Sequence, residues 1–273
     1  MNPLKYRRGL LLPALLFLSL AFSGTVLAQA GAVPAPRVLV EGEDLIYNVR
    51  YTFIDLGQVR IRNYGREKKV SFHAYETRAN IDSYKSIPFV DLHAIFLSTI
   101  DSAVYSRAFT GKVKQDDSWD YARYHFEYDR ERVLIEKGNR DTVVSQWDTL
   151  NVKGAQQDGL SLFYFAREHL YAGRTLHAPA IVAEKPVNAY INFVNKHDEV
   201  EIDAIEYPVD VVYFDGNLDF TGIFGLNGYF EGWFSNDEAR IPILAKMKVL
   251  IGSVTIELMS WKRQGWTPPR GRG

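Results

Sequence analysis

Histidine and carboxylate side chains are the groups in this sequence that could act together as a general acid and base. Two such pairs lie close along the chain, His125 with Glu127 and His197 with Asp198. A histidine oriented by a carboxylate can transfer protons near neutral pH, as hydrolysis of cell-envelope material would require. The first pair is also typical of the wet face of a strand. The second, in the polar run that ends at Glu199, is typical of a solvated hairpin turn.

The established catalytic and metal-binding motifs are missing. No histidine has a second histidine at metal-binding spacing, and H-E-x-x-H, G-x-S-x-G and G-x-G-x-x-G are absent. The chain has no cysteine, so it has no thiol nucleophile. These absences predict a protein that is not an enzyme and that holds no metal and no cofactor. The scattered histidines are His73, His93, His125, His169, His177 and His197.

Most of the secondary structure expected from the sequence is strand, so strands would have to position any functional site. Apolar and polar residues alternate over residues 45–53, and the same period of two recurs, between short polar turns, up to residue 258. One helix is expected over residues 158–171. Asp158 is its N-cap, apolar side chains follow at helical spacing, and Gly173 ends it.

This pattern predicts a mainly β fold, a strongly curved antiparallel sheet or open β-barrel with one principal helix packed against it. Such a sheet has a concave apolar face, which the protein's own side chains, a lipid-like ligand or a partner must fill. Trp233, Phe224 and Phe163 are the predicted lining of this cavity. The alternative interpretation places Trp233 and Phe224 in a filled aromatic core.

The N-terminus predicts export. Basic residues precede an apolar run over residues 10–22, and a small-x-small cleavage sequence follows at residues 28–30. This indicates a cleavable signal peptide and a location in the periplasm. The expected domains are a signal peptide over 1–30, a linker over 31–40, a single β-rich domain over 41–262 and a disordered tail over 263–273.

The composition of the chain excludes several classes of attachment and partner. Without cysteine the chain has neither a disulfide nor an acylation site, so it is not a lipoprotein. No other apolar run reaches the ~20 residues that a spanning helix needs, so the mature chain is expected to have no transmembrane span. Beyond residue 30 the chain has 29 basic and 33 acidic residues, a net charge of −4 that argues against a nucleic-acid partner.

Several motifs together resemble the bacterial exported family called domain of unknown function 3108. They are Gly42-Glu43-x-Leu45-x-Tyr47-x-Val49-x-Tyr51 with Leu56-Gly57, the helix from Asp158 to Arg167, Trp233-Phe-Ser-Asn-Asp237-x-x-Arg240-Ile-Pro242, and Ile251-Gly-Ser-Val254-x-x-Glu257-Leu258. The resemblance spans residues 41–258. It implies no catalytic residues, because the family has no assigned activity.

The pattern is similar, more loosely, to the periplasmic lipoprotein-carrier and lipoprotein-receptor fold, in which a curved sheet wraps a hydrophobic cavity closed by helices. This chain differs in having one clear helix. The leading hypothesis is therefore a non-catalytic periplasmic protein that binds a hydrophobic or lipid-like ligand or serves envelope maintenance. The alternatives are a protein–protein interaction module that uses an exposed strand edge, and a cell-envelope hydrolase.

Overall fold

The structure is a computed structural model that describes residues 37–67, 73–87, 91–139, 143–219, 228–249 and 252–272. These residues belong to one compact unit, residues 34–273. Within them, one antiparallel sheet contains the fourteen strands β1 (Asp44–Tyr51), β2 (Ile54–Glu67), β3 (Ala74–Ser83), β4 (His93–Asp101), β5 (Ser106–Gln115), β6 (Ser118–Glu127), β7 (Arg132–Asn139), β8 (Val143–Asn151), β9 (Thr175–Val182), β10 (Lys185–Val200), β11 (Val209–Leu218), β12 (Tyr229–Ser235), β13 (Pro242–Lys248) and β14 (Ser253–Lys262).

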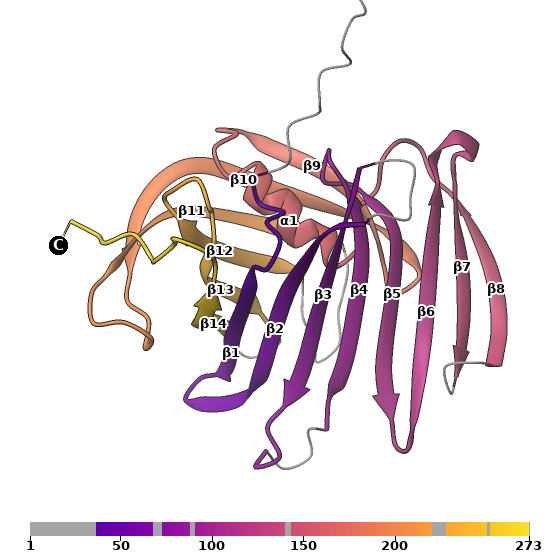
Figure 1. Cartoon of the computed structure of the whole chain (residues 1–273), viewed down its shortest axis with the longest axis horizontal. Coiled ribbons are helices and arrows are strands. Elements are labelled where there is room, and N and C mark those ends of the chain that lie inside the picture. Colours follow the sequence, from indigo (N-terminus) through magenta and orange to yellow (C-terminus); the bar gives the residue numbers. More distant parts are fainter. Residues whose placement is uncertain are drawn as a thin grey trace, which may run out of the picture. The chain divides into compact units, whose positions relative to one another are not determined.

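Each described strand except β8 pairs with the next one along the chain, and β1 pairs with β14, so a single missing pair keeps the sheet from closing into a ring. From one edge to the other it runs from β8 back to β1, across to β14, and back again to β9. Consecutive strands pair everywhere except between β8 and β9, where the chain instead forms the helix α1 (Ser161–Glu168). The sheet is therefore an open, curved antiparallel sheet rather than a closed barrel, and the predicted fold class is confirmed (Figure 1).

The helix is shorter than the predicted 158–171. Its N-cap residue is Leu160 rather than the predicted Asp158, but the Asp158 side chain still holds this end, because its Oδ1 accepts hydrogen bonds from the backbone N–H groups of Leu160 and Ser161 at 2.7 and 2.8 Å. The helix ends at Glu168 because Nη1 of Arg240 binds the carbonyl oxygens of Arg167 and Glu168. A single turn of 3₁₀ helix, Tyr128–Arg130, joins β6 to β7.

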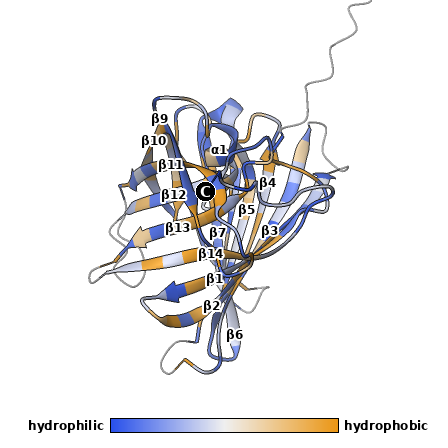
Figure 2. Cartoon of the chain, turned by 90° about the vertical axis from the view of Figure 1, so that its left-hand side faces the viewer, coloured by the Kyte–Doolittle hydropathy of each residue, from blue (hydrophilic) through white to orange (hydrophobic). Residues whose placement is uncertain are grey.

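The main hydrophobic core lies between α1 and the sheet. Figures 1 and 2 place α1 on the concave side, between β9–β12 and β3–β5, and Figure 2 shows hydrophobic and hydrophilic residues alternating along β13 and β14. Tyr164, Phe165 and Leu170, from the helix and the turn after it, pack in this core with strand residues such as Phe193 and Ile243. Burying one face of α1 and of the strands that pack against it removes apolar area from water, which stabilises the fold by roughly 25 cal/mol per Å².

A second, smaller core keeps β9 away from β8. Ile181 of β9 packs against side chains of β5, β6 and β7, among them Phe109 and Ile135. At the β9–β10 turn, Glu184 accepts hydrogen bonds from the hydroxyl of Tyr124 at 3.2 Å and from Lys137 at 2.7 Å. The tip of the β9–β10 hairpin thus lies on β6 and β7, and the ladder does not close.

The prediction of a disordered tail is wrong for residues 263–272, which contact the rest of the domain. Trp266 Nε1 donates to Asp237 Oδ2 at 2.7 Å, and its ring packs edge-on against Trp261. Arg270 forms a β-bridge with Val209, and Tyr207 donates to the carbonyl of Pro268 at 3.0 Å. The sequence misleads here because its prolines and glycines exclude a long strand, whereas single backbone and aromatic contacts are enough to hold an extended segment on the sheet.

Candidate ligand-binding cavity

An apolar cavity of about 280 Å³ lies between α1 and the strands opposite it. Its volume is close to the lower end of the ~300–1,000 Å³ typical of small-molecule sites. The helix, β1, β2 and β10–β14 all contribute to its wall. The lining residues are Tyr47, Val59, Ile61, Gly159, Leu162, Phe163, Ala166, Ala189, Ile191, Phe214, Leu218, Phe230, Glu231, Gly232, Phe234, Pro242, Ala245, Met247 and Ile256.

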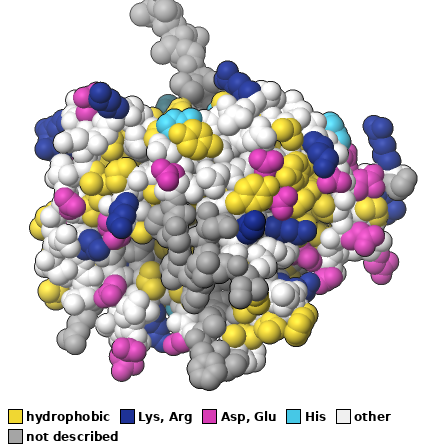
Figure 3. All heavy atoms as spheres, turned by 180° about the vertical axis from the view of Figure 1, so that it is seen from behind, with side chains coloured by type: hydrophobic (Ala, Val, Ile, Leu, Met, Phe, Trp, Pro, Cys, Tyr) yellow, Lys and Arg dark blue, Asp and Glu magenta, His cyan; other side chains and the backbone are white. Residues whose placement is uncertain are grey.

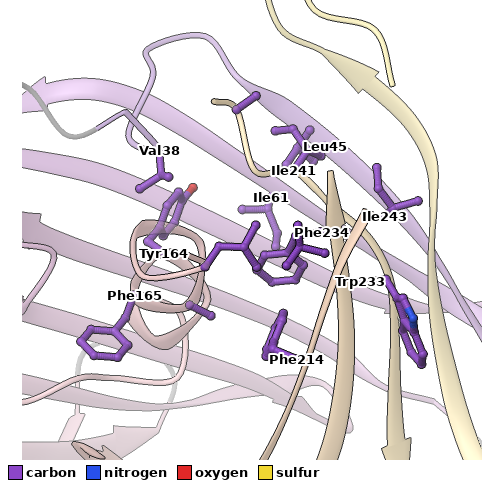
Figure 4. Packing of buried hydrophobic residues seen from close by; sticks show 14 of the residues in the cluster. Val38, Leu45, Ile61, Tyr164, Phe165, Phe214, Trp233, Phe234, Ile241 and Ile243 are labelled. Carbon is purple, nitrogen blue, oxygen red and sulfur yellow. The ribbon is translucent and has the colours of Figure 1, made fainter. Parts of the chain in front are cut away.

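Two glycines make room for the aromatic rings of this wall. A Cβ added to Gly232 would lie 2.4 Å from Cζ of Phe214, and one added to Gly216 would lie 2.3 Å from Cζ of Phe230. The absence of side chains there lets Phe214 and Phe230 lie flat across the neighbouring strands. Figure 4 shows Phe214, Phe234 and Ile61 facing one another beside α1.

The three predicted lining residues have different positions. Phe163 lines the cavity from α1. Trp233 lies on the other face of β12, where its Nε1 donates to Asp198 Oδ2 at 3.0 Å and its ring packs against Tyr213, 5.2 Å between ring centroids. Trp233 accordingly lies apart from the cavity side chains in Figure 4. Phe224 lies outside the described residues.

The helix is anchored at its C-terminal end by a buried ion cluster that sequence reasoning missed. The Arg167 guanidinium is fully buried and donates to both carboxylate oxygens of Glu43, at 2.6 and 3.0 Å. Arg263 donates to the same carboxylate at 2.5 Å. Arg167 also donates to the backbone carbonyls of Ala239 and Arg240. The motif residues Glu43 and Arg167 were visible in the sequence, but nothing local indicated that they pair.

A second buried ionisable side chain, that of Asp158, anchors the N-terminal end of the helix. Oδ2 of Asp158 accepts hydrogen bonds from the hydroxyls of Ser98 on β4 and Ser106 on β5, both at 2.5 Å. Burial raises the pKa of this carboxyl group, while the hydrogen bonds from Ser106 and Ser98 act in the opposite direction. Together the two anchors fix α1 across the concave face and so fix one wall of the cavity.

One polar group in the cavity wall has no hydrogen-bond partner. The Tyr47 hydroxyl is buried and unpaired among the described residues. Burial raises its pKa well above the usual range, so this hydroxyl is protonated and can donate. A buried hydroxyl without a partner costs about 1–3 kcal/mol. The neighbouring Tyr164 hydroxyl is likewise unpaired. The cavity wall is therefore apolar, and one of its residues, Tyr47, carries a buried hydroxyl that has no hydrogen-bond partner among the described residues.

The two acid–base candidates lie away from this cavity. His125 is exposed on β6, and Glu127 is held by Arg132 at 2.6 Å. His197 and Asp198 belong to strand β10, so the predicted hairpin turn is wrong. They line a polar hollow that also includes Asp210 and Asn236, and Asn236 Nδ2 lies 3.1 Å from His197 Nδ1. The pairing of β10 with β11 extends this segment, which its polar residues alone did not indicate.

A second polar hollow lies over β2 and β3, where Arg60 and Arg62 both donate to Asp44 Oδ2; its lining residues are Gln58, Arg60, Arg62, Arg78, Asn80 and Asp82. Among the described residues, no three histidine, aspartate or glutamate side chains are grouped to hold a metal ion. In the same part of the chain, no helix is long and apolar enough to cross a membrane. The face seen in Figure 3 carries basic and acidic side chains intermixed rather than one large region of a single sign.

Two solved structures align with this chain at low sequence identity. A β-barrel-like protein of domain of unknown function DUF1849 from Brucella abortus aligns with a TM-score of 0.55 at 13% identity, over 82% of this chain and 98% of that chain. A Bacteroides fragilis protein with a YmcC-like fold aligns with a TM-score of 0.35 at 8% identity, over 82% and 97% of the two chains. The first similarity supports a β-barrel-like fold and no more. No curated protein matches the chain.

The family resemblance expected from the sequence motifs is confirmed. The family model described as protein of unknown function, DUF3108, matches residues 46–259, which is most of the chain. The matched residues begin within β1 and end within β14, the two strands that pair at the centre of the sheet. The chain therefore belongs to the DUF3108 family.

Proposed function

We propose that this protein binds a hydrophobic or lipid-like molecule in the cavity between α1 and the sheet, without catalysing a reaction. The observation that carries the proposal is a cavity of about 280 Å³ with an almost wholly apolar wall. A hollow of this kind is favourable to fill, because apolar surface that leaves water contributes roughly 25 cal/mol per Å². The unpaired Tyr47 hydroxyl favours a ligand with a long apolar body and one hydrogen-bonding group.

The proposed site of action is the periplasm. The charged start, apolar run and cleavage sequence of residues 1–30 support export, and an apolar carrier or envelope-maintenance protein would meet its ligand there. Intact mass measurement of the protein released from the periplasm tests this point. The expected mass corresponds to a chain that begins near residue 31, and a full-length mass in the cytoplasmic fraction would contradict export.

Ligand binding is tested on protein purified from the periplasm. Native mass spectrometry and solvent extraction should detect a co-purified lipid or other hydrophobe, and a fluorescent fatty-acid probe should bind to the delipidated protein. If no hydrophobe co-purifies and apolar probes do not bind, the proposal fails.

A matched pair of variants locates the binding. Ala245 lines the cavity and pairs with Ile256, another lining residue, whereas Thr255 is adjacent to Ile256 and its side chain points to the opposite face of β14. Ala245→Trp fills the cavity and should weaken probe binding by about tenfold or more, and Thr255→Trp should leave it within about twofold. Equal effects of the two variants would place the probe elsewhere.

The non-catalytic part of the proposal rests on the positions of the candidate acid–base groups outside the cavity. Replacing His125 and His197 together by alanine should leave the cellular phenotype of the protein unchanged. Loss of that phenotype, with the variant still folded and still binding the probe, would favour a hydrolase instead.

A further inference from the structure

Strand β8 forms one edge of the sheet and is exposed along its whole length. It is the terminal strand of the strand order, and every residue from Val143 to Asn151 is exposed except Leu150, which is half-buried. Trp147 at its centre is 67% exposed and Val143 54% exposed. Among the described residues, β8 pairs with β7 alone. Within β8 the N–H group of Thr149 donates to Asp148 Oδ1 at 2.7 Å, and the other backbone groups of the outer edge are available to another strand.

The exposure of β8 follows from the way the sheet fails to close. The natural partner of β8 in a closed barrel is β9, but the β9–β10 hairpin lies instead on β6 and β7. Ile181 holds it there through the second core, and Glu184 through Tyr124 and Lys137. These contacts fix β9 inside the curve and leave β8 outside it.

The two edge strands of the sheet, β8 and β9, differ in how well they are protected from pairing with another strand. The β9 edge contains Pro179, which cannot donate a backbone hydrogen bond, and is also covered by a parallel bridge from Gln157 to Ala180. The β8 edge has no proline, lysine or arginine among its nine residues, and its one charge is Asp148. Proteins ordinarily protect an exposed edge with such residues. The β8 edge lacks them, as an edge used for pairing would.

The sequence of β8 is complementary to itself in the antiparallel direction. The register that overlaps all nine residues is centred on Trp147, so the two copies of this residue lie opposite each other. In that register Val144 lies opposite Leu150, and Ser145 opposite Thr149. Asp148 lies opposite Gln146, so the like-charge pairing that destabilises a sheet is avoided. The aromatic pair at the centre, the hydroxyl pairs of Ser145 and Thr149 on either side of it on the same face, and the apolar Val144–Leu150 pairs on the opposite face are contacts that stabilise antiparallel strands.

We infer that β8 pairs antiparallel with β8 of a second copy of this chain, with the two Trp147 residues at the twofold axis. This makes one continuous sheet across two copies, and the interface is isologous. The inference does not depend on the ligand proposed for the cavity, since β8 contributes no residue to the cavity wall.

Single-cysteine variants test the register directly, because the chain has no cysteine of its own. Residues directly opposite in an antiparallel pair have Cβ atoms ~4.5–5.5 Å apart, so Trp147→Cys should form a disulfide-linked dimer under mild oxidation. Val143→Cys places the two sulfurs about 25 Å apart in this register and should stay unlinked. Linking through Val143→Cys with none through Trp147→Cys would overturn the inference.

The oligomeric state of the cysteine-free chain provides the second test. Sedimentation velocity over a range of protein concentrations should show a dimer. Trp147→Lys places two positive charges opposite each other and should weaken the dimer about a hundredfold. Val194→Lys changes a similarly exposed apolar residue on β10, which has a partner strand on each side, and should change dimerisation less than about twofold. A chain that is monomeric at all concentrations, or a dimer that Trp147→Lys does not weaken, would overturn the inference.

Discussion

Arg167 and Arg240 each bind the backbone carbonyl groups of the other's chain segment. The guanidinium of Arg167, on α1, donates to the carbonyls of Ala239 and Arg240, at 2.9 and 3.1 Å. The guanidinium of Arg240 donates in return to the carbonyls of Arg167 and Glu168, at 3.1 and 2.5 Å. A positive group at the C-terminal end of a helix satisfies open carbonyl groups and interacts favourably with the helix dipole.

This exchange of hydrogen bonds explains how the loop between β12 and β13 is held in place against α1. Asp237 holds the loop from within, since its Oδ1 accepts from the backbone N–H groups of Ala239 and Arg240 and from the hydroxyl of Ser235. The loop thereby presents carbonyl groups to Arg167, and it fixes the helix that forms one wall of the cavity.

Removing the Glu43 carboxylate should strongly destabilise the protein. Glu43→Ala leaves the buried Arg167 guanidinium without its counter-charge, and breaking a buried pair in this way costs about 3–5 kcal/mol. The free energy of unfolding in urea measures the effect. Glu238→Ala is the control, because its pair with Arg37 is exposed and contributes ~0–1 kcal/mol. Equal small losses in both variants would show that the buried cluster does not anchor α1.

The C-terminal segment should contribute to stability. Trp266→Ala removes the hydrogen bond to Asp237 and the edge-on contact with Trp261, and we expect a loss of about 1–3 kcal/mol. In a domain of this size 1 kcal/mol corresponds to about 2–4 °C in Tm. The exposed neighbour Thr267, changed to alanine, should shift Tm by less than about 1 °C. An unchanged Tm for Trp266→Ala would contradict this contribution and would support the prediction that residues 263–273 are disordered.

Tyr47→Phe should have opposite effects on the empty and the ligand-bound protein. It removes a buried hydroxyl that has no partner, so the ligand-free protein should become more stable by about 1 kcal/mol. If the hydroxyl donates to the polar group of the ligand, affinity for a fatty-acid probe should fall about fivefold. Affinity for a probe without a polar group should not change. Unfolding curves of delipidated protein and probe titrations measure the two effects, and equal loss for both probes would contradict this role.

His169 should make the protein less stable in acid. Burial lowers the pKa of its imidazole below 6.5, and the hydrogen bond with the Phe165 carbonyl acts the other way. Because the folded pKa is below the unfolded one, the contribution of His169 is present above pH 6.5 and is lost as the pH falls through the folded pKa. His169→Phe keeps a ring against Phe165 and should lose less stability than the native chain between pH 7 and pH 5. Unfolding in urea at each pH measures this, and a stability difference that does not vary with pH would contradict it.

The sequence by itself determined the local structure. Alternation in segments such as residues 45–53 follows from burial of one strand face, and Asp158 marks the start of the helix because its side chain can cap open backbone N–H groups. The family motifs could also be read directly. These features depend on neighbouring residues, so they are visible in a linear pattern.

Only the tertiary structure decided what those elements enclose. Glu43 and Arg167 are 124 positions apart, and nothing near either residue indicates their pairing. The side of β12 on which Trp233 lies, away from the cavity, depends on its register with β11 and β13. The exposed β8 edge arises because the second core draws the β9–β10 hairpin onto β6 and β7. Contacts between distant segments are set by how whole faces pack together, and the period of a single strand does not contain that information.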